Sequence, residues 1–424
     1  MRGGLSLEPL DMVGVQIPHH FRCPISLELM RDPVTVSTGQ TYDRSSIEPW
    51  IAAGNITCPV TRAPLLDSAL IPNHTLRRLI QSWCVANRHS GVERIPTPKQ
   101  PADPSRVRLL LSQAASTSAS SSSANSAPRL SALRRLRTLA RDSDKNRALI
   151  ASLDARPVLL EVLFSDPRSE SSELEHEALA LLAMLQLAEP ECASVASDPD
   201  RVAYLTGLLF HPCVEVRINA AALIEAAVAG VRSPELRARV SGAAGIFEGV
   251  VGLLQDCGGC PRALKAGARA AFALCLVKPT RHLAVAAGAT AALVDRLADL
   301  ERGDAERALA TIELLCRVPA GCAALAGHAL SAPLLVRMIL KVSDRATEYA
   351  AGALLALCSA SEQCRREAVA AGVVTQLLLL VQSDCTERAK RKAQFLLKLL
   401  RDSWPEDSIG NSDDYACSEV VVPF

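Results

Sequence analysis

Aromatic residues are scarce in this chain of 424 residues, because Phe, Trp and Tyr together make up only 3% of it, while alanine and leucine dominate. Such a composition suits closely stacked helices rather than a β-sandwich. An excess of charge of either sign is also missing, since 46 Lys and Arg residues balance 45 Asp and Glu residues. That balance argues against a protein that lives on nucleic acid or on an acidic membrane surface.

Long apolar segments are missing as well. No apolar run approaches 18 residues without a charge, so we expect no transmembrane span. The first residues, Met1 to Ser6, lack the apolar core of a signal peptide, and Arg2 excludes a myristoylation site. We therefore expect the 14 cysteines to be reduced and buried, in a protein of the cytoplasm that could also enter the nucleus or be recruited peripherally to membranes.

Complete pairs of metal ligands are absent from the first 70 residues. Cys23 is followed three positions later by Ser26, and Cys58 by Thr61, so each pair offers one thiol and one hydroxyl. One thiolate per pair cannot hold structural zinc, so hydrogen bonds and charge pairs must hold this segment, and we expect no metal and no cofactor. The only intact C-x-x-C, Cys257 to Cys260, has neither a second pair nor a thioredoxin-like context and is predicted to be a loop.

The N-terminal segment resembles a known family. Residues 21–65 resemble a RING domain without its zinc ligands, and the segment as a whole is similar to a U-box. The resemblance rests on Phe21–Met30, Asp32–Val34, Gly39–Tyr42, Trp50, Cys58–Thr61, Leu70–Asn73, Leu76, Ile80 and Trp83. It covers about 70 residues with fixed internal spacing. Together with the helical remainder, it makes the chain resemble the plant U-box/armadillo ubiquitin ligases.

The predicted fold class is mainly α, with a small α+β U-box (a zinc-free, RING-like module) joined by a disordered linker to an α-solenoid. Four prolines between Pro96 and Pro104, followed by a stretch of Ser and Ala, favour the linker. The expected segments are a flexible N-terminus (1–17), the U-box (18–92), a Pro- then Ser-rich linker (93–128), about six armadillo repeats (129–404) and a C-terminal tail (405–424).

Internal repetition predicts the solenoid. The triplet Ala-Ala-Gly ends at Gly245, Gly288 and Gly372, with offsets of 43 and then 84, which is twice 42. A period near 42 is typical of armadillo and HEAT arrays, in which each unit cannot bury its apolar face alone and therefore stacks on its neighbours. We expect the recurring glycine to permit the turn between the second and third helices of each unit.

The resemblance implies a reaction as well as a fold. Ligases of this type form no covalent ubiquitin–enzyme intermediate; they dock a ubiquitin-charged conjugating enzyme and restrain its thioester so that a lysine can attack. It places Ile25, Leu27, Trp50 and Pro59 in the patch that binds the conjugating enzyme. It also places Arg62 as the cation that bridges conjugating enzyme and ubiquitin. Without the resemblance, Ile25 and Trp50 would be interpreted as core residues.

A second group of residues is assigned to holding the U-box together in place of zinc. Buried polar groups of this kind must be nearly all satisfied, and their individual pairings stay open at this point. Cys23 has no neighbouring base in a recognisable arrangement, so we do not expect it to act as a nucleophile. The group comprises Glu28, Asp32, Thr41, Asp43, Arg44, Ser45, Cys58 and Thr61.

The array is expected to bind a protein substrate in its groove. No Trp occurs between Trp83 and Trp404, which excludes importin-like capture of basic peptides on Trp ladders. The resemblance further allows a U-box homodimer and implies a role in plant defence or stress signalling through protein turnover. One alternative stays open, a non-enzymatic armadillo scaffold with a degenerate U-box.

Overall fold

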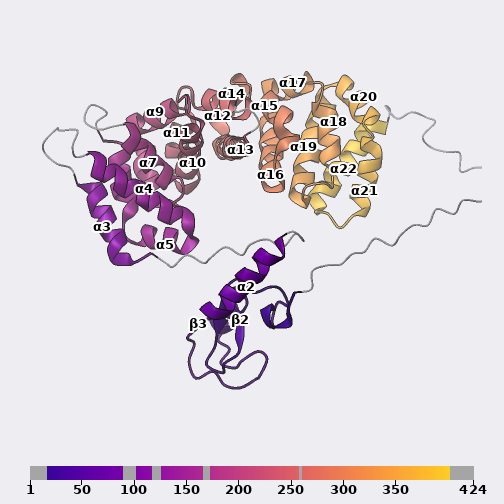
Figure 1. Ribbon diagram of the computed structural model, residues 1–424. Coiled ribbons are helices and arrows are strands. Elements are labelled where there is room, and N and C mark those ends of the chain that lie inside the picture. Colours follow the sequence, from indigo (N-terminus) through magenta and orange to yellow (C-terminus); the bar gives the residue numbers. More distant parts are fainter. Residues whose placement is uncertain (1–16, 89–101, 117–125, 166–171, 257–259, 402–424) are drawn as a thin grey trace, which may run out of the picture. The chain divides into compact units, whose positions relative to one another are not determined.

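The chain forms two compact units in the computed structural model, residues 1–100 and 101–424, and each is described by itself. The structure describes residues 17–88, 102–116, 126–165, 172–256 and 260–401 (Figure 1). The predictions for residues 1–16, for the Ser-rich stretch from 117 to 125, for Cys257 and for the tail 405–424 lie outside these ranges.

The N-terminal unit is a small α+β domain built on a three-stranded antiparallel sheet. The strand order is β2-β1-β3, and Val34 of the central strand lies opposite Tyr42 on one side and Pro72 on the other. The elements in chain order are η1 (His19–Phe21), β1 (Pro33–Thr35), β2 (Thr41–Asp43), α1 (Arg44–Ala52), β3 (Ile71–Pro72) and α2 (His74–Ala86).

The core of this unit is compact and continuous. Val34, Tyr42 and Ile47 are fully buried, and α2 adds Ile80 and Cys84 from its inner face. Asn73 fixes the start of α2, because its side-chain oxygen accepts a hydrogen bond from the N–H of Leu76, three residues into the helix. The sheet and both helices therefore share one apolar centre, to which the loops contribute buried residues such as Cys23 and Cys58.

In its described residues, the C-terminal unit consists of α-helices and the two short 3₁₀ turns η4 (Lys278–Thr280) and η5 (Leu297–Asp299) (Figure 1). Most of its helices pack into one continuous apolar core, in which alanine and leucine predominate. The helices are α3 (Pro104–Ala115), α4 (Ser126–Asp142), α5 (Asp144–Ser152), α6 (Ala155–Leu163), α7 (Ser172–Leu182), α8 (Glu189–Ser197), α9 (Pro199–Leu208), α10 (Val214–Gly230), α11 (Pro234–Ser241), α12 (Ile246–Gln255), α13 (Pro261–Cys275), α14 (Arg281–Ala286), α15 (Ala289–Arg296), α16 (Arg302–Cys316), α17 (Pro319–Ala326), α18 (Ser331–Met338), α19 (Asp344–Ala360), α20 (Glu362–Ala370), α21 (Val373–Gln382) and α22 (Glu387–Leu400).

Every third helix stacks on the next one of its kind. The stack runs from α4 through α7, α10, α13, α16 and α19 to α22, and two outer helices separate each stacked helix from its successor. The described residues thus form six three-helix units after α4, an arrangement typical of armadillo arrays. The small residues along the stacked helices, such as the buried Ala268 and Ala271 of α13, let neighbouring helices approach closely.

The recurring glycines lie at a different turn from the one predicted. Gly245, Gly288 and Gly372 directly precede α12, α15 and α21, with φ between 80° and 82°. When the stacked helix is counted as third, this is the turn between the first and second helices. The physical role is the expected one, because only glycine adopts this left-handed conformation without strain. Asp154 occupies a similar position before α6 with φ 52°.

The predicted linker boundary is wrong over residues 104–115, which form α3 within the array. Asp103 and Pro104 begin the helix, the former accepting a hydrogen bond from the N–H of Ser105. The side chains that enter the core follow helical spacing and are Val107, Leu110, Leu111 and Ala114. Arg129 Nε also donates a hydrogen bond to the carbonyl of Ala114. The helical spacing of these apolar residues therefore predicts the structure of this segment better than the prolines that precede it.

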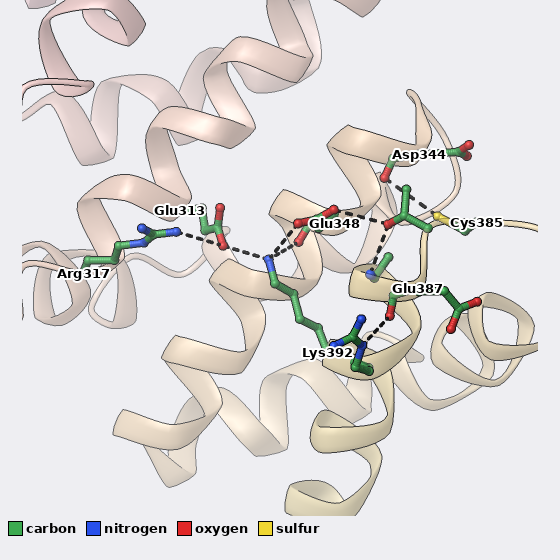
Figure 2. Close-up of polar contacts among 10 residues, drawn as sticks. Glu313, Arg317, Asp344, Glu348, Cys385, Glu387 and Lys392 are labelled. Atoms are coloured by element: carbon green, nitrogen blue, oxygen red, sulfur yellow. Dashed lines mark hydrogen bonds and ion pairs between the residues drawn. The ribbon is translucent and has the colours of Figure 1, made fainter.

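Ion pairs link successive stacked helices near the C-terminal end of the array (Figure 2). Lys392 of α22 lies 2.8 Å from Glu313 of α16, and its ammonium donates a further hydrogen bond to the carbonyl of Glu348 in α19. Gly352 of α19 leaves the room for this contact, since an added Cβ would lie 2.7 Å from the Lys392 ammonium. One cation thus ties three helices of three successive units.

Close backbone contact inside one unit gives a test of this packing. A Cβ on Gly321 of α17 would overlap the backbone carbonyl of Leu315 and lie 2.9 Å from a methyl group of Val285. We expect Gly321→Ala to lower the free energy of unfolding of the array by about 2 kcal/mol, as overpacking does elsewhere. Urea denaturation followed by circular dichroism measures the change.

Gly327→Ala is the matched control for that variant. Gly327 follows α17 directly, and the nearest atom to its added Cβ is 3.6 Å away, an ordinary contact. Its substitution should leave stability nearly unchanged. Equal stability of the two variants would contradict the close approach at Gly321.

Candidate functional site

Two surface loops of the N-terminal unit share one backbone geometry. In the first loop, Cys23 N–H donates to the carbonyl of Glu28, and Leu27 N–H donates back to the carbonyl of Cys23, both at 2.8 Å. The second loop repeats this pattern between Cys58, Arg62 and Ala63 at 2.9 Å. These are the loops in which a hydroxyl residue, Ser26 or Thr61, stands three positions after the cysteine.

The fifth residue of each loop adopts a left-handed conformation. Leu27 has φ 60° and Arg62 has φ 58°, values that are strained for residues with a side chain. Both side chains are exposed, and Leu27 retains 70% of its accessible surface. Each loop therefore keeps an unfavourable backbone conformation at a position whose large side chain faces solvent.

The predicted binding residues lie on the surface of the U-box rather than in its core. Ile25 is 40% exposed and Trp50 is 37% exposed, while Pro59 is half-buried. The indole N–H of Trp50 donates a 2.9 Å hydrogen bond to the carbonyl of Thr57, just before the second loop. The polar edge of the ring is thereby satisfied, and part of its apolar surface stays open to a partner.

Sequence reasoning missed one member of this surface. Val60 is 51% exposed and occupies the same position in the second loop that Ile25 occupies in the first. Aligning the run from Cys23 with the run from Cys58 in the printed sequence would have found it. We define the docking patch as Ile25, Leu27, Trp50, Pro59 and Val60.

Two adjacent residues of β2 anchor both loops. The sulfur of Cys23 accepts a 3.3 Å hydrogen bond from the N–H of Asp43, and the sulfur of Cys58 lies 2.9 Å from the hydroxyl of Tyr42. The Tyr42 hydroxyl also accepts a 3.3 Å hydrogen bond from the N–H of Val60. The two thiols thus fasten their loops to the same point of the sheet.

Four of the residues predicted to replace zinc form one network. The Asp43 carboxylate accepts hydrogen bonds from the N–H groups of Arg31 and Asp32, at 3.1 and 2.7 Å, and from the Ser45 hydroxyl at 2.7 Å. Arg44 Nε lies 2.7 Å from the carboxylate of Asp32. Sequence reasoning missed one further member, Arg77 of α2, which forms an ion pair with Asp32 across the domain.

The other predicted members lie elsewhere. Thr41 pairs with Thr35 across the β1–β2 ladder at 2.9 Å and stays outside the carboxylate network. Thr61 accepts a 3.4 Å hydrogen bond from the N–H of Ala63 inside the second loop and also hydrogen-bonds to Cys58, so it belongs with the thiol anchor of that loop. Glu28 is exposed, and within the described residues no contact draws its side chain toward Asp43.

The thiol of Cys58 is acidic in this environment. Burial raises its pKa, but hydrogen bonds from Thr61, Tyr42 and Thr38 outweigh burial and lower the pKa to about 6. Burial of the Tyr42 ring and its bond to Cys58 raise the pKa of the tyrosine. The pair is therefore best described as a neutral tyrosine hydroxyl that donates to a thiolate, which strengthens the anchor of the second loop.

The described ranges contain neither a membrane-spanning helix nor a metal cluster. No single helix there is long and apolar enough to cross a membrane; only α16 and α17 taken together reach that length, and the pair is bent by 116°. No three His, Cys, Asp or Glu side chains among the described residues come together in a way that could hold a metal ion.

Comparisons with known proteins agree with this architecture. The U-box domain family matches residues 17–89, and the plant U-box protein ARM repeat region matches residues 110–420. U-box domain-containing protein 26 of Arabidopsis thaliana is 65% identical over 99% of both chains, and E3 ubiquitin-protein ligase PUB23 of the same plant is 34% identical over 96% of this chain and 97% of its own. The chain belongs to the plant U-box/armadillo-repeat E3 ubiquitin ligases.

One solved structure has a fold similar to that of this plant U-box protein. A chain from a structure of the interaction between cadherin and beta-catenin aligns with a TM-score of 0.56 and 15% identity, covering 79% of this chain and 59% of that one. At such low identity the likeness concerns the fold alone. The family match and the fold therefore agree on a U-box followed by armadillo repeats.

The strained loop positions generate a prediction about stability. Glycine adopts a left-handed conformation freely, so Arg62→Gly should raise the free energy of unfolding of the U-box by up to about 1 kcal/mol. Arg62→Ala keeps the strain and should be nearly neutral. Urea denaturation monitored by Trp fluorescence in a Trp404→Phe background, which leaves Trp50 and Trp83 as reporters, compares the two. A glycine variant less stable than the alanine variant would refute the argument.

The acidic thiol generates a prediction about pH. Because the pKa of Cys58 is lower in the folded U-box than in an unfolded chain, the unfolded state binds more protons between pH 6 and pH 8, and stability rises with pH. We expect a rise of about 1–2 kcal/mol across that window. Cys58→Ser should remove most of it, although the lowered pKa of Cys23 contributes in the same sense. An unchanged slope in Cys58→Ser would show that the thiol is not ionised.

Proposed function

We propose that this protein docks a ubiquitin-charged conjugating enzyme on the docking patch and promotes direct transfer of ubiquitin to lysines of a bound protein. The observation that carries the proposal is the pair of matched loops, which leave Ile25 and Val60 exposed, together with the partly exposed ring of Trp50. A small apolar surface with one aromatic anchor, held on a rigid frame, is what a transient interface requires.

Arg62 is proposed to contact both the conjugating enzyme and ubiquitin. It follows the second loop's Thr61, its backbone N–H helps to close the loop by donating to the carbonyl of Cys58, and its side chain is exposed. A guanidinium can bond to two partners at once through its separate N–H groups. Holding ubiquitin in one arrangement increases the fraction of time in which the thioester is open to attack, with no covalent step on the ligase.

The armadillo repeats are proposed to select the substrate. Their stacked helices form a continuous series, linked across units by pairs such as Arg137–Glu177 at 2.9 Å and Lys392–Glu313 at 2.8 Å. A series of this kind gives an extended surface that suits a protein rather than a small molecule. Two relatives of this chain carry the name E3 ubiquitin-protein ligase, which supports a role in protein turnover. Plant defence or stress signalling is proposed as the process on the family resemblance alone.

The division of labour within the docking site can be tested by substitution. Ile25→Ala and Trp50→Ala remove apolar contact and should weaken binding of a conjugating enzyme by about tenfold or more. Arg62→Ala should leave that binding within about twofold and slow discharge of ubiquitin to free lysine by at least about tenfold. Calorimetry measures the affinity and single-turnover discharge measures the rate.

Arg62→Lys is the informative control, because it keeps the charge but removes the planar fork of donors. It should recover only part of the discharge rate. Equal loss of binding in all three alanine variants would contradict the assignment of separate roles. Failure of the unmodified protein to build chains with any member of a conjugating-enzyme panel would favour the scaffold alternative.

A further inference from the structure

The last repeat leaves uncovered a row of apolar side chains that every comparable repeat buries. The left-handed glycines set the register, so Val251, Val294 and Leu378 are equivalent, each six residues after its glycine. Val251 and Val294 are 5% and 1% exposed, whereas Leu378 of α21 is 46% exposed. In these earlier repeats the helix that carries the position, α12 or α15, contacts a helix of the unit that follows.

Two positions, one on either side of Leu378 along α21, are likewise more exposed than their equivalents in the earlier repeats. Two residues after the glycine, Phe247 and Thr290 are each 2% exposed, but Val374 is only half-buried. Nine residues after it, Leu254 and Leu297 are each 1% exposed, and Val381 is again half-buried. Val374, Leu378 and Val381 are spaced by four and three residues, so they form one stripe along α21.

The stacked helix beside this stripe, α22, carries polar or charged residues at positions where the preceding stacked helix, α19, has buried ones. Ser343 caps α19 and Thr386 caps α22, each by accepting a hydrogen bond from the N–H three residues later. The two helices can therefore be aligned in sequence at these caps. The buried Ala351 of α19 then corresponds to the exposed Gln394. The other pairs, Thr347 with Lys390 and Cys358 with Arg401, replace a fully buried residue with a cation that is half-buried or exposed.

We call this surface the terminal face and define it as Val374, Leu378 and Val381 of α21 with Lys390, Gln394 and Arg401 at α22. It lies on the last two helices of the array, beyond which the described residues contain no further helix (Figure 1). Because this surface is an apolar stripe beside two cations, a complementary partner would carry apolar and acidic side chains.

The chain itself supplies such a segment. Residues 402–424 follow Arg401 directly and contain six acidic residues but no Lys or Arg. The same segment carries Trp404 and ends in the apolar run Val420–Phe424. Its 23 residues exceed by far the length needed to pass along α21, which has 10 residues and is about 15 Å long.

The family match adds an independent reason. The plant U-box protein ARM repeat region extends to residue 420, although the last described helix ends at Leu400. We propose that residues 402–424 cover the terminal face, with their apolar side chains on the Leu378 stripe and their carboxylates toward Lys390 and Arg401. The segment would thereby close the array at its C-terminal end, the role that a polar capping repeat has in other solenoids.

Hydrogen–deuterium exchange of the full chain, compared with a chain that ends at Arg401, tests this proposal. If the segment covers the terminal face, its removal should speed exchange of the backbone amides in Val373–Gln382 by about fivefold or more, because the last repeat then opens more often. Amides of α10 and α13 should be unaffected. Equal protection of α21 in the two chains would overturn the proposal.

A matched pair of substitutions tests whether the effect is specific to the terminal face or arises from replacing any exposed leucine of α21. Leu378→Ser should reproduce the effect of removing the segment, and it should add little when the segment is already absent. Leu379→Ser is the control, since Leu379 is 49% exposed and the equivalent Asp295 is a surface residue in an earlier repeat. Similar effects of both substitutions would argue against a specific stripe.

A second copy of the chain is the competing occupant, and light scattering after gel filtration identifies it. The full chain should run as a species whose mass does not depend on Leu378. A dimer that Leu378→Ser dissociates would mean that another copy covers the terminal face, and the proposal would be wrong. Ubiquitin discharge to free lysine should be the same with and without residues 402–424, so this outcome is independent of the docking patch.

Discussion

The two exposed loops of the U-box depend on one pair of neighbouring residues, Tyr42 and Asp43. Their hydroxyl and backbone N–H hold the sulfurs of Cys58 and Cys23, and the Asp43 carboxylate fixes the chain at Arg31 and Asp32. A zinc site would hold each loop with bonds to a single ion. Here the same work is divided among hydrogen bonds that converge on the end of one strand. Those to the two sulfurs are buried, where a hydrogen bond is stronger than in water.

That arrangement explains how strained loops can persist. Leu27 and Arg62 each have a left-handed backbone that costs on the order of 1 kcal/mol. The two backbone hydrogen bonds of each loop and its thiol anchor over-determine the conformation, so the strain is maintained. The result is that a leucine and an arginine stand out at equivalent points of two loops, where a relaxed loop would place glycine.

The fold class and the family could be predicted from the sequence, whereas contacts that cross the domain could not. The fixed spacing of Cys23, Trp50 and Cys58 carried the U-box resemblance, and the glycine period carried the solenoid. The pairing of Asp32 with Arg77 could not be predicted, because it joins residues 45 positions apart whose types occur on any surface. α3 was missed for a different reason. Its four apolar residues have helical spacing, but the prolines before them and the serines after them led to the whole segment being assigned to the linker.

The two ends of the described solenoid differ in how their outermost helices separate the core from water. At the first end α3 buries Val107 and Leu111 against the array and turns Arg106 and Arg108 outward, so an amphipathic helix separates core from water. At the other end α22 has acquired polar residues, but α21 has kept the apolar stripe of an internal repeat. A surface of that kind costs free energy in water unless something covers it. The asymmetry is resolved without a further repeat if the acidic and apolar segment that directly follows α22 supplies the cover, because its charges match the cations that replaced buried residues on α22.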